Sequence, residues 1–158
     1  MATLHYHGHS TFTLVTDDGT RIVIDPWFDE NPVSDVKADE IQDVDFILCT
    51  HGHFDHFADA IPLATRTGAT LVSTFEIVSF AQSKGVDNAH PLHIGGGVNF
   101  PFGYVKMTPA LHGGQVAGDE EGAAVLDVVQ RARQKADRAR GSDRQVQPEP
   151  DLLFRPDQ

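Results

Sequence analysis

Asp45-Phe46-Ile47-Leu48-Cys49-Thr50-His51-Gly52-His53-Phe54-Asp55-His56 is the stretch of sequence that decides the fold of this chain. Residues 45–50 form an uninterrupted apolar run of strand length, which predicts an interior strand covered on both faces. This strand delivers the chain into residues 51–56, which hold three imidazoles and one carboxylate. Because alternate residues of an extended segment point the same way, His51 and His53 can share one metal ion.

The remaining two polar residues of this stretch, Asp55 and His56, are expected after a turn, where they can face a second metal ion. Imidazole and carboxylate donors suit Zn²⁺, with Mn²⁺ and Fe²⁺ as alternatives. A pair of ions would lower the pKa of bound water and polarise the bond under attack. A surface turn that happens to be rich in histidine is the competing interpretation, and the position directly after an apolar strand argues against it.

The flanking sequence alternates between strand and helix patterns. Asp17-Asp18-Gly19 is typical of a hairpin turn, and Gly68 and Gly85 are expected to end helices. The order predicts a mixed α/β fold with helices packed on a sheet. We expect strands at 4–7, 11–16, 20–25, 45–50, 70–73, 89–94, 98–100 and 104–108, and helices at 57–66 and 75–84.

The H-x-H-x-D-H pattern of residues 51–56 resembles the signature of the metallo-β-lactamase superfamily. Gly8-His9-Ser10, Asp25-Pro26 and Asn31-Pro32 look like the subgroup of small metal-dependent hydrolases similar to L-ascorbate-6-phosphate lactonase. The resemblance covers roughly residues 2–118. It implies the N-terminal half of an αββα sandwich and hydrolysis of an ester, lactone or phosphoester by metal-activated water.

The resemblance also implies which residues bind metal. The first ion would be held by His51, His53 and His112, and part of the second site would be formed by Asp55 and His56. Asp55 would orient the attacking water or take up its proton. An imidazole at position 53 favours hydrolysis over the diiron redox chemistry of relatives that carry glutamate there.

Five further residues have weaker implied or predicted roles. Asp25, which ends an early strand, would brace the ligand loop without binding the metal itself. His9 either lines the pocket or is a turn residue satisfied by backbone groups. His5 and His7, which lack a motif, are expected on an ordinary solvent-facing edge. Cys49, inside the apolar strand, is expected to be a small buried thiol.

The sequence changes character near Asp119, so we predict a partial metallo-β-lactamase domain at 1–118 and an atypical region at 119–158. A helix is expected over 121–140 and a loose tail over 145–158. The later Gly-Asp-Thr segment and final histidine of the family have no match here. A truncated or frameshifted product, a half-domain that pairs with another copy, and a short single-metal protein with a helical cap all remain open.

Charge, hydropathy and cysteine content limit the kinds of partner and the location that we expect. A net charge of −11 argues against nucleic-acid binding, which needs a basic patch. No apolar run is long enough to cross a membrane, the start does not look like a signal peptide, and there is one cysteine. We therefore expect a cytoplasmic protein acting on a small molecule, with self-association through an uncovered sheet face. A non-catalytic metal-binding or partner-binding remnant is the alternative function.

Overall fold

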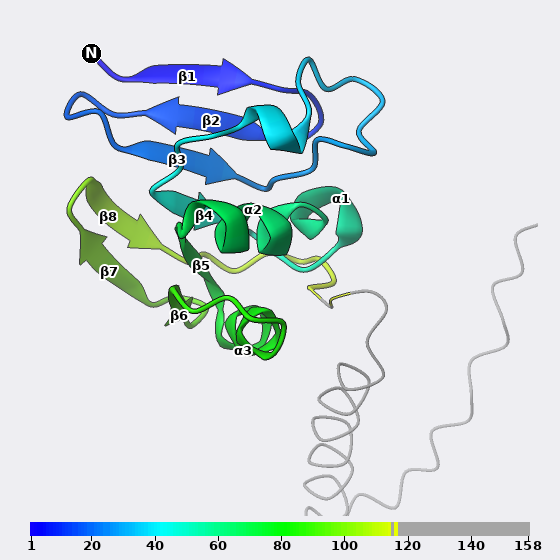
Figure 1. Cartoon of the computed structure of the whole chain (residues 1–158). Helices are drawn as coiled ribbons and strands as arrows, with labels where there is room; N and C mark the ends of the chain where they lie inside the picture. The colour runs from blue at the N-terminus through cyan, green and yellow to red at the C-terminus, as the bar shows by residue number, and fades with distance from the viewer. Residues whose placement is uncertain (115, 117–158) are drawn as a thin grey trace, which may run out of the picture. The chain divides into compact units, whose positions relative to one another are not determined.

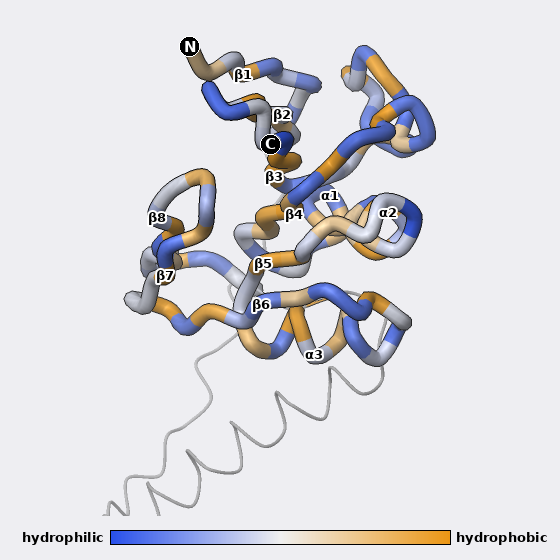
Figure 2. Tube along the Cα trace, turned by 60° about the vertical axis from the view of Figure 1, so that its left-hand side comes forward, coloured by the Kyte–Doolittle hydropathy of each residue, from blue (hydrophilic) through white to orange (hydrophobic). Residues whose placement is uncertain are grey.

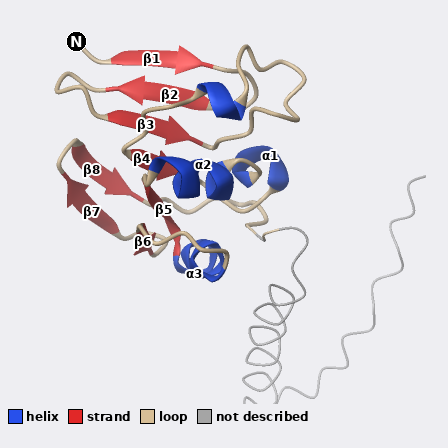
Figure 3. Ribbon diagram, in the orientation of Figure 1, coloured by secondary structure: helices blue, strands red, loops and turns tan. Residues whose placement is uncertain are grey.

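The computed structural model describes residues 1–114 and 116, so the predicted C-terminal helix, tail and 119–158 region lie outside the described residues. Figures 1 and 3 show three strands, then helices between the strands up to β6, and finally β7 and β8, which pair only with each other among the described strands. Their bounds are β1 (Thr3–Tyr6), β2 (Phe12–Val15), β3 (Arg21–Ile24), η1 (Ala38–Glu40), β4 (Phe46–Leu48), α1 (Phe54–Phe57), α2 (Ala60–Thr67), β5 (Thr70–Thr74), α3 (Phe75–Ser83), β6 (Ala89–Leu92), β7 (Gly97–Phe100) and β8 (Gly103–Lys106). None of the helices described is long and apolar enough to cross a bilayer.

The sheet is mixed, as the sequence predicts. Strands β1 to β6 lie in sequence order; the β1–β2 and β2–β3 pairs are antiparallel, and the β3–β4, β4–β5 and β5–β6 pairs are parallel. Gly19 adopts a φ of 90° in the predicted hairpin turn, a conformation that glycine takes without steric cost. The parallel strands end on one edge, and β4 carries the metal-ligand stretch to that edge.

The core lies between the sheet and its helices. Figure 2 shows the helices on one side of the sheet and the β7–β8 hairpin on the other. Val23, Ile47 and Leu71 are register neighbours on the helix side, and each is 0% exposed. Removing these side chains from water stabilises the fold and fixes β4 at the centre of the sheet.

The helix predicted over 57–66 is present as α2, but it begins three residues later than predicted, because Phe57 ends the short helix α1 and Ala58 and Asp59 lie between the two helices. The Asp59 carboxylate is buried and accepts hydrogen bonds from the backbone N–H groups of Phe28 and Asp29, at 2.5 and 3.2 Å. This contact anchors the loop after β3 to the helix break. Gly68 ends α2 with a φ of 72°, as expected for a helix C-terminus.

The face of the sheet opposite the helices is covered unevenly. At one end, Phe46 of β4 packs against Phe100 and Phe102 of the β7–β8 hairpin, with ring centroids 5.4 and 4.6 Å away. This contact and the helices on the other face confirm that β4 is an interior strand. At the other end, Leu4 and Tyr6 of the edge strand β1 are 60% and 58% exposed. The described residues therefore leave an apolar edge open.

The expectation that His7 faces solvent is wrong. Its side chain is 6% exposed, with Nδ1 2.7 Å from Asp35 Oδ1 and Nε2 2.8 Å from Thr13 Oγ1. The ring is buried because the segment between β3 and η1 folds back over the end of β1. His5, two residues earlier, is exposed as predicted and also contacts Asp35.

Candidate metal centre

Three histidine rings converge just beyond the end of β4. His51 Nε2 lies 3.1 Å from His53 Nδ1, which lies 3.2 Å from His112 Nε2. Two donors bound to a tetrahedral Zn²⁺ at about 2.0–2.1 Å lie about 3.3–3.4 Å apart. The spacing of these nitrogens therefore fits a metal ion, and the structure brings together the three residues predicted to hold the first one.

His112 reaches this place because its segment packs closely on the ligand loop. The N–H of Gly52 donates to the carbonyl of Gly114 at 3.2 Å, and Val116 packs against the core. A Cβ added to Gly52 would lie 2.7 Å from Val116 Cγ2. Position 52 must therefore be glycine for the backbone to pass this close.

The Asp25 side chain holds the ligand loop in place, as the family resemblance implies. It is 3% exposed, and its φ of 47° is unusual for a residue with a side chain. The carboxylate accepts hydrogen bonds from the Thr50 N–H and hydroxyl at 2.7 and 2.8 Å, and lies 2.9 Å from His56 Nδ1. Held by Nδ1, His56 leaves its Nε2 free to bind a metal.

A second group of donors stands beside the first. His9 Nε2 and His56 Nε2 lie 3.0 and 3.9 Å from Asp55 Oδ2. The donor atoms of these three residues all lie within 4.8 Å of one another, so the group can hold an ion. His9 also has a positive φ of 54° and packs edge-on against Trp27 and His56, at 5.2 and 5.1 Å.

The placement of Asp55 and His56 differs from the predicted turn. Both lie in the short helix α1, which begins directly after His53. His53 itself is extended, with φ and ψ of −66° and 147°. The chain thus changes from strand to helix inside the motif, so consecutive side chains diverge and separate the two groups of donors. Neighbouring residues do not share a face on a helix.

The electrostatics favour metal binding. Burial, followed by the nearby imidazoles of His56 and His53, lowers the pKa of His51. The neutral ring is the form that binds metal. Burial alone would raise the pKa of Asp55, but its own backbone N–H and the rings of His56 and His9 outweigh it and lower the pKa. Both residues are therefore in their metal-binding forms near neutral pH.

Sequence reasoning missed the part of Thr50. Its hydroxyl donates to Asp25 and lies 2.9 Å from His51 Nδ1, so it links the brace to the first ligand. Its position between the strand and the motif was the only signal in the sequence.

Cys49 is fully buried, as predicted. Its burial raises the pKa of the thiol well above the ordinary range, as expected of an inert thiol.

With this geometry established, the similarity to known proteins is decisive. Residues 20–136 match the beta-lactamase superfamily domain. The chain belongs to the metallo-β-lactamase superfamily. The family fold and the motif at the end of β4 agree, so the family implied by the sequence is confirmed.

Relatives in this superfamily are named for hydrolysis. A metal-dependent hydrolase of Heliobacterium modesticaldum is 50% identical over 78% of this chain and 49% of its own length. One from Rubrobacter xylanophilus is 46% identical over 76% of this chain and 49% of its own length. The solved structure of a metallo hydrolase from Ignicoccus hospitalis matches with a TM-score of 0.63 and 34% identity, over 71% of this chain and 50% of that one. The chain therefore spans about half the length of these relatives.

Proposed function

We propose that this chain is the metal-binding half of a hydrolase that cleaves an ester, lactone or phosphoester with metal-activated water. The observation that supports it is the convergence of His51, His53 and His112 next to the second group of donors, whose His56 ring lies 4.1 Å from that of His51 between centroids. Three imidazoles leave one position open on a tetrahedral ion, as in catalytic zinc sites. A bound ion would supply an activated water and polarise the substrate.

The residues of the chain have distinct tasks in this proposal. The three histidines would hold the first ion, and Asp55 would accept a proton from the attacking water. His9, 3.0 Å from Asp55 Oδ2, donates to that carboxylate and keeps its orientation. Asp25 holds His56 in the tautomer that presents Nε2. The strained backbone at His9 supports a functional role, because such strain costs about 1–3 kcal/mol.

A non-catalytic metal-binding protein is the second candidate. The second group of donors favours it. The described residues supply only His9, Asp55 and His56 there, and the later aspartate and histidine that complete the second site in the family have no match in this chain. Zinc is our first choice of metal because the first group is purely nitrogen, with Mn²⁺ and Fe²⁺ as alternatives. The identity of the small-molecule substrate stays a prediction. A cytoplasmic location also stays a prediction, and it is supported by the single unpaired cysteine.

Metal removal separates the two candidates. We expect the chain loaded with Zn²⁺ to hydrolyse a simple lactone or bis(p-nitrophenyl) phosphate, and we expect dialysis against a chelator to abolish this turnover. Zn²⁺ or Mn²⁺ added back should restore turnover, since the ligands are side chains already brought together. The measurements are product release and metal content per chain. Bound metal without turnover on any substrate class would leave the non-catalytic function.

We also propose that the open edge of the sheet binds a second copy of this chain. Across the register, Leu4 pairs with Leu14 and Tyr6 pairs with Phe12, so all four face the side opposite the helices. Within residues 1–114, β2 is the only strand that pairs with β1, so the other side of β1 is a strand edge that no described strand covers. An identical copy presents the same apolar residues and the same edge, so a two-fold pairing satisfies both at once.

Leu4→Lys tests this pairing. Burial of a leucine contributes about 1.5–3 kcal/mol, and every 1.4 kcal/mol is tenfold in Kd, so we expect the dimer to weaken at least tenfold. The measurement is sedimentation velocity over a concentration series. Ser79→Lys, which adds the same charge on the exposed surface of α3, is the control and should dimerise like the parent. A parent chain that stays monomeric at all concentrations rules out the pairing.

A further inference from the structure

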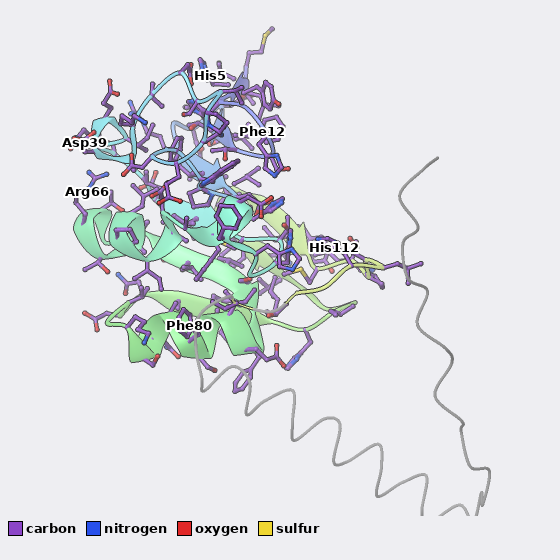
Figure 4. All side chains as sticks on the ribbon, turned by 90° about the vertical axis from the view of Figure 1, so that its right-hand side faces the viewer. His5, Phe12, Asp39, Arg66, Phe80 and His112 are labelled. Atoms are coloured by element: carbon purple, nitrogen blue, oxygen red, sulfur yellow. The ribbon has the colours of Figure 1, made fainter. Side chains whose placement is uncertain are left out.

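A third cluster of metal-binding side chains lies apart from the proposed centre. It consists of His5 in β1, His7 just after it, and Asp35 in the segment before η1. Figure 4 shows the labelled His5 well separated from the labelled His112 of the metal centre. None of the three residues has a task in the proposed hydrolysis, so their convergence needs its own explanation.

The geometry of the cluster centres on one carboxylate. His5 Nε2 lies 2.6 Å from Asp35 Oδ2, and His7 Nδ1 lies 2.7 Å from Asp35 Oδ1. The two rings are 4.3 Å apart between centroids. The contact between Asp35 Oδ1 and His7 is enough to pair the buried Nδ1 of His7, so the contact with His5 is additional. The second imidazole arrives because residues two apart near the end of a strand share a face.

We propose that His5, His7 and Asp35 form a separate binding site for a divalent transition metal such as Zn²⁺. Two imidazoles and one carboxylate are a donor set that Zn²⁺ accepts, with waters in the remaining positions. The side chains of His5 and Asp35 are 56% and 48% exposed, so an ion can enter from solvent. The net charge of −11 raises the local concentration of cations.

Entry of an ion requires only small movements. Donors around a tetrahedral ion lie about 3.3 Å apart. The His5 and His7 rings, which start 2.6 and 2.7 Å from the carboxylate, must therefore withdraw by about 0.7 and about 0.6 Å. Both His5 and Asp35 can rotate because they are half exposed. The hydrogen bonds of His7 and His5 lower the pKa of Asp35 to about 2, so the carboxylate is already ionised.

Each imidazole can keep its ring proton on the nitrogen that faces away from the ion. When His7 Nδ1 binds the ion, its proton resides on Nε2 and is donated to Thr13 Oγ1, which lies 2.8 Å away. His5 carries its proton on Nδ1, in solvent. The bound form of each ring is the neutral imidazole, and binding involves no covalent or redox step within the protein. A hydrogen bond on the far nitrogen is the usual support of a histidine that binds metal.

The site would be structural. It ties the end of β1 to the segment that carries Val33, and Val33 packs on Gly8 so closely that a Cβ there would lie 2.7 Å from Val33 Cγ2. Gly8 directly precedes His9, whose φ of 54° aims its ring at Asp55. An ion bound here therefore stabilises the turn that presents His9 without touching the reaction.

Counting Zn²⁺ in variants of the full chain tests this site. The chain and its His5→Ala variant are saturated with Zn²⁺ at neutral pH, passed through gel filtration, and assayed for metal per chain. We expect His5→Ala to hold one ion fewer, and His93→Ala to hold as many as the parent. His93 is an exposed histidine stacked on Phe75, and it belongs to none of the donor groups that the described residues form.

The same count in a His51→Ala, His53→Ala background makes the result independent of the proposed hydrolase. Adding His5→Ala to that background should remove one further ion, and it should also remove a rise in thermal midpoint that Zn²⁺ causes there. Folding is not at risk in His5→Ala because the side chain is 56% exposed. An unchanged ion count in both backgrounds overturns the proposal and leaves a metal-free hydrogen-bonded cluster.

Discussion

Replacing His51 by alanine is expected to remove one bound ion per chain and to reduce hydrolysis to the rate of the metal-free protein. The variant leaves only His53 and His112 in the first group of donors. Loss of a partner that merely orients a ligand costs about 10–100-fold in metal affinity, and loss of a ligand itself costs more. We therefore expect affinity at the first site to fall by more than about 100-fold.

The measurements are competition with a chromophoric chelator for metal affinity, and product release for turnover. His51 makes its side-chain contacts with Thr50 and the other ligand rings, so its loss should leave the fold intact, which a thermal melt checks. His93→Ala is the matched control. If His51→Ala retained the parent's metal content and affinity, the first site would lie elsewhere.

The motif and its strand could be predicted because both are local. The apolar run before His51 determines an interior strand, and the spacing of His51 and His53 determines that their rings meet; the structure bears out both expectations. His112 could be placed only through the family resemblance. Its contact depends on the close approach of Gly52 and Gly114, which no local pattern announces.

The parts that could not be predicted depend on contacts between distant segments. The break between α1 and α2 exists because Asp59 binds backbone groups 30 and 31 residues away. His7 is buried because Asp35, 28 residues later, reaches it. A sequence pattern describes one segment at a time, so it started the helix at residue 57, three residues before α2 begins, and it wrongly placed His7 on a solvent-facing edge.

Asp25→Asn is expected to weaken metal binding at the second group of donors about 10–100-fold, because it moves the ring proton of His56 from Nδ1 to Nε2. In the parent, the Asp25 carboxylate accepts from the Thr50 N–H and hydroxyl and from His56 Nδ1. The asparagine oxygen can keep the Thr50 N–H, but its amide then presents N–H donors to His56. The ring must respond by placing its proton on Nε2, the nitrogen that would bind the metal.

The tautomer of His56 is therefore the measurement that distinguishes this explanation from a general loss of stability. We expect ¹⁵N chemical shifts to report protonated Nε2 in Asp25→Asn and protonated Nδ1 in the parent, both without metal. A buried hydrogen bond lost here also costs about 1–3 kcal/mol of unfolding free energy. Asp43→Asn is the control. The Asp43 side chain is 83% exposed, and its long ion pair with Arg21, at 3.7 Å, contributes little to stability. Weaker metal binding with His56 still protonated on Nδ1 would mean that Asp25 acts by holding the backbone of the loop, through Thr50, and not by setting the ring.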